Sequence, residues 1–304
     1  MQIKKALSRR ERVGFAMLIA AAVGFGISPS CAKLAYSAGA EPLTLVFARF
    51  TVCLLGIIAI SHLRNVPLLI EKKLVLRALL MGCLLAWNAS GYLSAVKYVP
   101  VSLAAALFYT FPVQVGVISA VCGLDSLTKR RVLALFVAFA GVLLSVGFGT
   151  YEADWRGVVL AIGAGTGVAM SSVLFAKIAQ EGNSITLVFW AMIAASAVSW
   201  LVMSLSVGVQ LPNDRLGWIG FLISMFAFAF ALVAYYLALP LVGAVRAALT
   251  ANLEPVIAII VAIIVLREEP RSLQLVGITL ILGAVFLARY GVQSSPGRSG
   301  SQGS

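Results

Sequence analysis

Ten apolar stretches of about 20 residues run through the sequence, and they limit the possible folds more than any other feature. They cover roughly residues 13–36, 42–62, 74–95, 100–122, 131–150, 156–179, 185–208, 216–238, 243–266 and 272–290. An α-helix of about 20 residues crosses the hydrocarbon core of a bilayer, which is about 30 Å thick. Most stretches lack the strict alternation of membrane β-strands, which are also about half as long. We therefore expect an all-α integral membrane protein with ten transmembrane helices.

The charged residues fit a membrane protein better than a nucleic-acid-binding one. Only 11% of the residues are charged, whereas a soluble domain holds about a quarter. The net charge of +12 is spread over the short segments between the spans. The first span together with the basic arm before it, residues 1–12, also fits a signal peptide, but an uncleaved first span keeps an even number of spans. The four cysteines form no metal-binding pattern, so we expect no metal and no cofactor.

The sequence matches itself at an offset of about 143 residues, which indicates an internal repeat. The coinciding residues are Pro112 with Pro255, Tyr92 with Tyr235, Gly24 with Gly167 and Ser28 with Ser171. The motif TLVF at 44–47 recurs at 186–189. We predict two five-helix copies, about 13–149 and 156–290. Because five is an odd number, the second copy enters the membrane from the opposite side, which makes an inverted repeat.

The basic residues favour one side of the membrane. In the first copy, most Lys and Arg residues lie before the first span and in the links between spans two and three and between spans four and five. The equivalent links of the second copy are nearly neutral. Because basic segments stay in the cytoplasm, we expect both termini there. The Gly- and Ser-rich residues 291–304 predict a disordered tail.

Pro112 and Pro255 mark equivalent interruptions in two spans. Each proline removes a backbone donor and frees a carbonyl one turn earlier. Inverted repeats place substrate sites near the bilayer midplane, where the copies meet and where helices are interrupted. The two prolines are therefore candidate helix breaks beside a binding site. The alternative is that each proline is only a packing kink.

Glu254 precedes the second proline, about 17 Å into its span and near the bilayer centre. An ionised carboxylate there costs several kcal/mol on a lipid-facing helix, so it should face the interior and be paired, hydrated or protonated. Two roles remain open: a binding or proton-coupling group in the transport path, or a structural group bonded to another helix. Arg246 lies two turns away but roughly 80° round the same helix, so we expect no direct ion pair with Glu254.

Polar and aromatic side chains near the interruptions are candidate substrate contacts. Asn88 and Tyr92 share one face of the third span, and the motif FYTFP of the first copy aligns with ANLEP of the second. Serines at equivalent positions are candidates for hydrogen bonds across the centre. The candidate substrate-binding residues are Asn88, Tyr92, Tyr109, Phe111, Tyr235, Asn252, Ser28 and Ser171. For each of them the alternative is packing or an interhelical hydrogen bond.

Two further features of the spans indicate structural roles. Arg49 lies about 10 Å into the second span, shallow enough to reach the interface or to fix a neighbouring carbonyl. The small-residue steps Ala20-x-x-x-Gly24 and Gly163-x-x-x-Gly167 coincide under the repeat offset. They predict a close-packing face on the first helix of each copy.

Several segments resemble one family of carriers. AAVGFGISPSCAKLA, PLTLVFARF, GYLSAVKYVPVSLAAALFYTFPV and LEPVIAIIVAIIVLREEPRSLQLVGITLILGAVFLA are similar to EamA-type carriers of the drug/metabolite transporter superfamily. The resemblance covers about 15–290. It implies ten helices in two inverted repeats, cytoplasmic ends and export of metabolites by alternating access. Within the family the chain is most similar to bacterial amino-acid exporters that favour aromatic and other hydrophobic amino acids. This similarity implies an inner-membrane protein with cavity residues at Asn88, Tyr92, Tyr109 and Phe111.

The sequence therefore favours a secondary transporter that exports amino acids across the inner membrane. A drug or other small-metabolite exporter of the same fold is the alternative within transport. A non-transporting membrane scaffold or a membrane-integral enzyme is the alternative of another class. An enzyme is not expected, because the chain holds one histidine, no Walker loop and no HExxH or GxSxG motif. The expected partners are an amino-acid substrate and the lipid bilayer, with no nucleic acid, and we expect a monomer.

Overall fold

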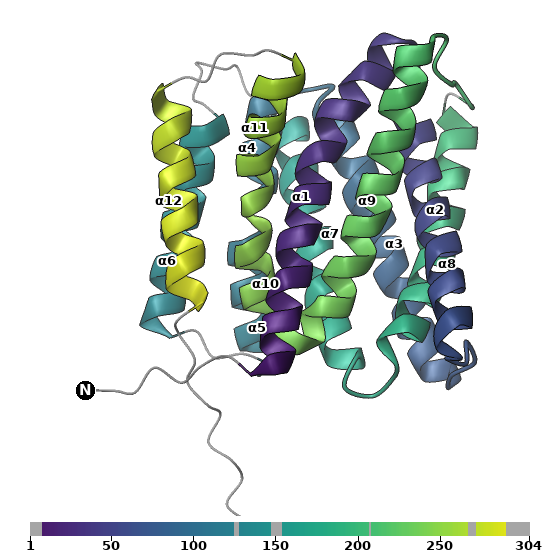
Figure 1. The fold of residues 1–304 in the computed structure, drawn as a ribbon, viewed down its shortest axis with the longest axis vertical. Helices are drawn as coiled ribbons and strands as arrows, with labels where there is room; N and C mark the ends of the chain where they lie inside the picture. Colours follow the sequence, from purple (N-terminus) through teal and green to yellow (C-terminus); the bar gives the residue numbers. More distant parts are fainter. Residues whose placement is uncertain (1–7, 125–127, 147–153, 207, 267–271, 290–304) are drawn as a thin grey trace, which may run out of the picture.

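The computed structural model of the 304-residue chain describes residues 8–124, 128–146, 154–206, 208–266 and 272–289 (Figure 1). The described residues form helices and their connections. The helices are α1 (Arg9–Ser37), α2 (Pro42–Arg64), α3 (Lys72–Ala95), α4 (Val101–Phe108), α5 (Phe111–Val121), α6 (Lys129–Val146), α7 (Trp155–Ile178), α8 (Ser184–Ser206), α9 (Arg215–Val242), α10 (Ala244–Ala251), α11 (Leu253–Leu266) and α12 (Ser272–Arg289). Most of the expected basic arm and all of the expected disordered tail lie outside the described residues.

Each of the ten predicted spans is helical: eight contain one helix and two contain a pair of shorter helices, which confirms the fold class. The fourth predicted span contains α4 followed by α5, and the ninth contains α10 followed by α11. Within the described residues, eight segments are long and apolar enough to cross a membrane, and α12 is a shorter apolar helix. The helix α6 begins with three basic residues, Lys129, Arg130 and Arg131, which lower its mean hydropathy.

Side-chain caps define where several helices begin. Ser8 and Glu11 form a capping box at the start of α1: the Ser8 hydroxyl accepts from the Glu11 amide at 3.2 Å, and the Ser8 amide donates to the Glu11 carboxylate at 3.0 Å. Asp154 caps α7 through the Arg156 amide, and Asp214 caps α9 through the Gly217 amide. Each cap satisfies amides that have no partner within the helix.

The packing of helices repeats when the two copies are exchanged. The close pair α1 and α9 has its counterpart in α7 and α3, and the pair α2 and α9 has its counterpart in α8 and α3. The helices α6 and α12, which are equivalent, pack against each other, as do α2 and α8. Figure 1 shows α4 above α5 but α10 below α11, so the two interrupted spans run in opposite directions. The described helices therefore have the inverted symmetry that the odd number of helices per copy predicts.

Two glycines bring helix backbones into direct contact at equivalent places. A Cβ atom on Gly24 of α1 would lie 2.6 Å from the carbonyl oxygen of Ala227 on α9. A Cβ atom on Gly167 of α7 would lie 2.8 Å from the carbonyl oxygen of Leu84 on α3. Ala227 and Leu84 are themselves related by the repeat offset. Small residues thus form the close-packing face that the sequence predicts for the first helix of each copy.

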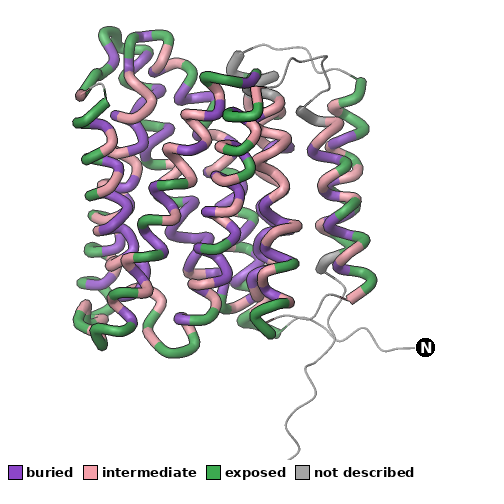
Figure 2. The backbone as a smooth tube through the Cα atoms, turned by 180° about the vertical axis from the view of Figure 1, so that it is seen from behind, coloured by how far each residue is buried: buried purple, intermediate pink, exposed green. Residues whose placement is uncertain are grey.

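Burial follows the pattern of a bundle surrounded by lipid. Buried positions lie mainly inside the bundle and exposed positions on its outside (Figure 2). Large apolar side chains such as Leu76, Trp200, Leu205 and Phe230 are more than half exposed. A soluble protein rarely exposes so many large apolar groups, whereas lipid accepts them.

The two ends of the bundle differ in charge. At the lower end in Figure 1, α1, α3 and α6 begin with Arg9, Lys72 and Lys129. At the upper end, α7 and α9 begin after the acidic caps Asp154 and Asp214. The basic helix starts thus gather at one end, as the predicted topology requires.

The two ends also differ in what joins the repeats. At the lower end, Arg77 pairs with Glu181 at 2.9 Å and Arg246 pairs with Glu11 at 3.2 Å, and each pair links one copy to the other. At the upper end, the contacts between copies include the backbone hydrogen bonds from Asn213 to Ala38 at 2.8 Å and from Glu41 to Gln210 at 3.2 Å. The lower end also has neutral hydrogen bonds between the copies, from the Thr186 hydroxyl to the Pro67 carbonyl at 2.8 Å and from Trp190 to the Leu68 carbonyl at 2.9 Å. Ion pairs therefore add to neutral hydrogen bonds at the lower end.

Candidate functional site

Two helix breaks face the interior of the bundle at equivalent positions of the two copies. Tyr109 and Thr110 separate α4 from α5, and Asn252 separates α10 from α11. Pro112 and Pro255 each lie in the first turn after the break. A proline there removes no helical hydrogen bond, because the first amides of a helix have no partner within it. The segments α5 and α10 contact each other, so the two breaks lie close together.

The first break has its own hydrogen bonds. The Thr110 hydroxyl donates to the Leu107 carbonyl at 2.7 Å and accepts from the Gln114 amide nitrogen Nε2 at 2.9 Å. Gly165 of α7 lies against the break, because a Cβ atom there would be 2.8 Å from the Phe108 carbonyl oxygen. The Leu107 carbonyl also accepts from the Thr110 amide at 3.2 Å, so Thr110 bonds it twice, and a glycine lies against the neighbouring backbone.

Four aromatic rings surround this break and form what we call the aromatic cluster: Tyr92, Phe108, Tyr109 and Phe111. Phe108 is central, with ring centroids 5.4 Å from Tyr92, 5.4 Å from Tyr109 and 5.5 Å from Phe111. Phe111 is buried, and the other three rings are partly exposed. Such a group provides an apolar wall with polarisable ring faces. Of the candidate residues, the structure places Tyr92, Tyr109 and Phe111 in this cluster.

Glu254 connects the second break to the aromatic cluster. Its carboxylate and the Tyr109 hydroxyl form a side-chain hydrogen bond, and Glu254 is partly exposed. Among the described residues it has no ion-pair partner, and Arg246 pairs with Glu11 instead. The carboxylate thus faces the interior, next to the rings and still accessible.

Asn252, at the second break itself, is 1% exposed. Its oxygen Oδ1 is buried and has no hydrogen-bond partner among the residues that the structure describes. A buried acceptor without a partner costs about 1–3 kcal/mol. Such groups are uncommon in native proteins and point to a bound group or water at the site.

A second polar group, which we call the arginine cluster, consists of Ser28, Arg49, Ser224 and Phe228. Nη2 of Arg49 donates to the hydroxyl of Ser28 at 2.9 Å and to that of Ser224 at 2.7 Å. The guanidinium also lies 4.9 Å from the centroid of the Phe228 ring. Ser28 therefore bonds across to α9, as expected for a serine at the centre. Ser224 aligns with Met81 under the repeat offset, so the repeat comparison could not find it.

The remaining candidates lie between α7 and its neighbours. Ser171 bonds to the Tyr236 hydroxyl at 2.9 Å, and Ser172 bonds to the Tyr235 hydroxyl at 3.2 Å. All four are buried, and no described hydrogen bond or ring contact joins Tyr235 to the aromatic cluster. The structure therefore places Ser171 and Tyr235 where they fasten α7 to α9.

Asn88 faces α7 as well. A Cβ atom on Gly167 would lie 3.4 Å from the Asn88 Cβ atom, and the neighbouring Trp87 donates to the Gly163 carbonyl at 3.1 Å. Tyr92, one turn along α3, reaches the aromatic cluster from the same helix face.

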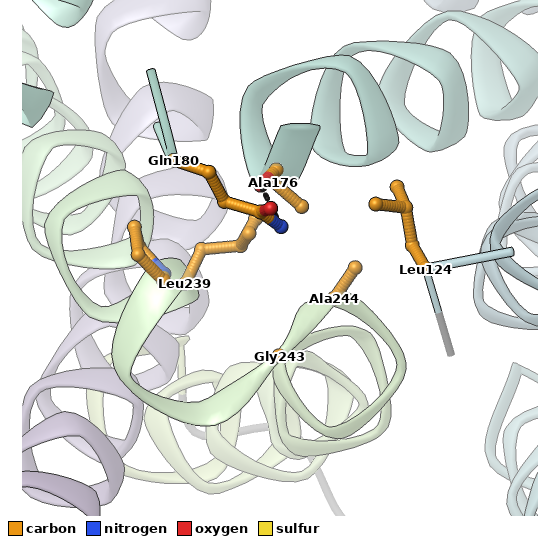
Figure 3. A pocket seen from close by; sticks show the side chains of 7 residues that line it. Leu124, Ala176, Gln180, Leu239, Gly243 and Ala244 are labelled. Carbon is orange, nitrogen blue, oxygen red and sulfur yellow. Dashed lines mark hydrogen bonds between the residues drawn. The ribbon is translucent and has the colours of Figure 1, made fainter. Parts of the chain in front are cut away.

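A small pocket lies at the lower end of the bundle, away from the two breaks (Figure 3). It is lined by Leu124, Ala176, Gln180, Leu239, Pro240, Gly243 and Ala244. The Gln180 side chain crosses it and bonds to the Ala176 carbonyl at 3.3 Å. Within the described residues, no group of three or more His, Cys, Asp or Glu side chains could hold a metal ion.

Comparisons with known proteins agree with this architecture. The model of the EamA-like transporter family matches the chain twice, over residues 12–147 and 155–290. A solved structure described as "Crystal structure of protein" is 19% identical to the chain and has a TM-score of 0.75. The similarity covers 93% of this chain and 98% of that one; at this identity it concerns the fold alone. Among curated proteins, none matches the chain significantly.

Proposed function

The chain belongs to the EamA-like transporter family, and from this membership we propose that it exports amino acids with aromatic or other hydrophobic side chains across the inner membrane. Membership makes the protein a multi-pass membrane transporter of small solutes, in a family of transporters and not of enzymes. The substrate class, the direction of transport and the inner membrane are the proposed parts.

The observation that carries the proposal is the position of Glu254 against the aromatic cluster. An amino acid with a hydrophobic side chain needs an apolar wall for that side chain and a partner for its ammonium group. The rings of Tyr92, Phe108 and Tyr109 supply the wall, and the Glu254 carboxylate supplies the partner. Asn252, with its unpaired oxygen, adds a second acceptor at the adjoining break.

Alternating access explains how this site would serve transport. The two breaks lie where the inverted copies meet, and the copies can tilt against each other around that point. The basic lower end supports a cytoplasmic location for both termini. We propose that the protein works as a monomer, because the aromatic cluster and Glu254 come from one chain.

A hydrophobic cationic drug is the second candidate substrate, favoured by the same contacts. A cation beside aromatic rings gains about 0.5–2 kcal/mol from the ring faces, and a carboxylate adds charge pairing. Such a compound would use the rings and Glu254 as an amino acid does, so the two substrate classes must be separated by experiment.

The test is counterflow into proteoliposomes that contain the purified protein. The vesicles are loaded with unlabelled L-phenylalanine, and uptake of labelled phenylalanine, methionine and tetraphenylphosphonium is measured. We expect uptake of both amino acids and much less of the phosphonium. Vesicles without protein provide the background.

Two variants are compared with the native protein. Glu254→Gln removes the central carboxylate, and Glu181→Gln removes a carboxylate from the exposed lower ion pair. We expect the first to lose amino-acid uptake and the second to retain it. Uptake of the phosphonium but of no amino acid would favour the drug exporter. A folded protein that moves neither compound and is not stabilised by either would contradict the proposed substrates.

A further inference from the structure

The arginine cluster contains a positive charge that forms no ion pair with any of the described residues. Both hydrogen bonds of the Arg49 guanidinium come from Nη2 and go to neutral hydroxyls. Its Nε is buried and has no partner among the described residues. Arg49 also takes part in no ion pair within the described part of the chain. The cluster therefore orients the guanidinium without neutralising it.

The two serines hold the guanidinium through a closed set of hydrogen bonds. The Ser224 hydroxyl donates to the Ser28 carbonyl at 2.7 Å, and the Ser28 hydroxyl lies 3.1 Å from the Ser224 carbonyl as its donor. Each hydroxyl thus has a carbonyl to which it can donate, and the two hydroxyl oxygens lie 3.0 Å apart, so both oxygens keep lone pairs that accept from Arg49. Together with the Phe228 ring on one face, these contacts fix the orientation of the guanidinium between α1, α2 and α9.

A fixed guanidinium inside a membrane bundle is costly unless an anion approaches it. Removing an ionised group from water costs several kcal/mol, and neutral hydroxyls repay only part of that. Arginine offers a planar fork that matches a carboxylate and can bind it through two hydrogen bonds. Since Arg49 is partly exposed, such an anion can reach it.

Glu254 lies near the arginine cluster, because a Cβ atom on Gly26, two residues before Ser28, would be 2.6 Å from the Cβ atom of Ile257, one turn after Glu254 on α11. Arg49 and Glu254 themselves form no ion pair. At about 1.5 Å per residue, Arg49 lies about 10 Å below the upper end of α2 and Glu254 about 18 Å below the upper end of α11. Both charges thus lie well inside the bundle, away from the helix ends. The cationic and anionic groups of one small molecule can fit between them.

We infer that Arg49, oriented by Ser28 and Ser224, binds the carboxylate of the transported amino acid while Glu254 binds its ammonium group. This inference rests on the proposed function and assigns the second polar end of the substrate. It replaces the structural role that the sequence favours for Arg49. The aromatic cluster beside Glu254 then receives the substrate side chain.

The experiment compares four ligands that differ only in their charged groups: L-phenylalanine, its amide, phenethylamine and 3-phenylpropionate. Their affinities are measured from the stabilisation of purified native protein and from competition with labelled phenylalanine in counterflow. We expect phenylalanine to bind about 10-fold more tightly than its amide, because the amide cannot form the charged hydrogen bonds to Arg49. This comparison requires no variant, so it remains decisive even if a change at Arg49 prevents folding.

Variants then test whether the preference for phenylalanine over its amide depends on Arg49. In Arg49→Met we expect phenylalanine to bind no better than its amide, with the affinity for phenethylamine unchanged. Arg49→Lys keeps the charge without the fork, so it should retain part of the preference. Arg77→Met, which removes an arginine from the lower ion pair, is the matched control and should keep the native preference.

The outcomes separate this inference from the proposed function. Equal affinity of the native protein for phenylalanine and its amide would overturn the role of Arg49 while leaving amino-acid transport intact. An equal loss for all four ligands in Arg49→Met would assign Arg49 to structure and overturn the inference. Binding of 3-phenylpropionate that depends on Arg49, without exchange of any amino acid, would support the anion site and contradict the proposed substrate. Failure of every carboxylate to bind would overturn both.

Discussion

The first helix break and the second occupy equivalent places in the two copies but differ in chemistry. At the first, the Thr110 hydroxyl and amide both bond to the Leu107 carbonyl, and aromatic rings pack on either side. At the second, Asn252 keeps an unpaired buried oxygen, and Glu254 stands where the first copy has Phe111. At the first break the Thr110 hydroxyl is bonded within its own copy, whereas the second break offers the Asn252 oxygen and the Glu254 carboxylate to a ligand.

This difference shows how a duplicated scaffold can acquire one asymmetric site. The glycine contacts at Gly24 and Gly167 are the same in both copies, so the frame has stayed symmetric. The side chains at the breaks have diverged, so that one copy supplies an apolar wall and the other supplies charge. A substrate with one apolar and one charged part is suited to such a pair.

The largest effect should come from removing the charge at the second break. We expect Glu254→Gln to reduce amino-acid counterflow at least about 30-fold, because losing one partner of a desolvated charge contact costs 2 kcal/mol or more. Tyr109→Phe, which removes only the hydroxyl bonded to that carboxylate, should reduce it a few-fold. A larger loss in Tyr109→Phe than in Glu254→Gln would reverse the roles assigned to the two breaks.

The second effect tests whether the helix contacts at Gly24 and Gly167 are equivalent in the two copies. Gly24→Ala and Gly167→Ala each force a Cβ atom against a backbone carbonyl, and we expect each to destabilise the protein by about 1–2 kcal/mol. The measurement is the midpoint of thermal unfolding in detergent. Gly56→Ala is the control, since a Cβ atom there meets nothing within 4 Å and alanine favours the helix. Unequal losses at the two contact glycines would show that the frame has diverged as well.

The third effect compares the polar groups of the breaks. Thr110→Val removes a hydroxyl with two partners and should cost about 1 kcal/mol of stability. Asn252→Leu removes an oxygen that has no partner among the described residues, so we expect little loss of stability in the absence of substrate but a weaker affinity for amino acids. Thermal unfolding with and without phenylalanine measures both changes. A large loss of stability in unliganded Asn252→Leu would mean that the Asn252 side chain stabilises the folded protein and does not act mainly in substrate binding.

The smallest effect concerns the ion pair that holds the second interrupted span. Arg246 of α10 pairs with Glu11 of α1, whereas the equivalent residue of the first copy is Leu103. We expect Glu11→Gln to cost no more than about 1 kcal/mol, because the pair is partly exposed. Glu181→Gln, in the other lower ion pair, should behave alike. An effect on transport as large as that of Glu254→Gln would place Glu11 in the site.

Much of the fold follows from the sequence for simple physical reasons. Apolar length fixes the spans, and the coincidence of Pro112 with Pro255 under the repeat offset identifies the interrupted spans. Proline alone does not, because Pro29 and Pro240 lie inside the unbroken helices α1 and α9. The repeat offset identifies the equivalent glycines. These features depend on local chemistry and on the chain's similarity to itself, both of which can be read from one sequence.

The contents of the site are harder to predict, because contacts depend on how each helix is rotated against its neighbours. The repeat linked Tyr235 to Tyr92, yet Tyr235 bonds to Ser172 while Tyr92 packs on Phe108. Ser224 has no serine at its equivalent position, so nothing in the sequence marks it as a partner of Arg49. Equivalence in sequence therefore predicts depth in the membrane better than it predicts contacts.

The ion pairs between the two copies at the lower end of the bundle make the contacts at that end sensitive to dissolved ions. Exposed ion pairs weaken as ionic strength rises, while neutral hydrogen bonds change little. The side chains of the lower pairs are 16–45% exposed, whereas backbone hydrogen bonds join the copies at the upper end. Electrolyte on the lower side therefore weakens the two ion pairs there but not the neutral bonds of Thr186 and Trp190 to the link between α2 and α3. Opening toward that compartment should then become somewhat easier as its salt concentration rises.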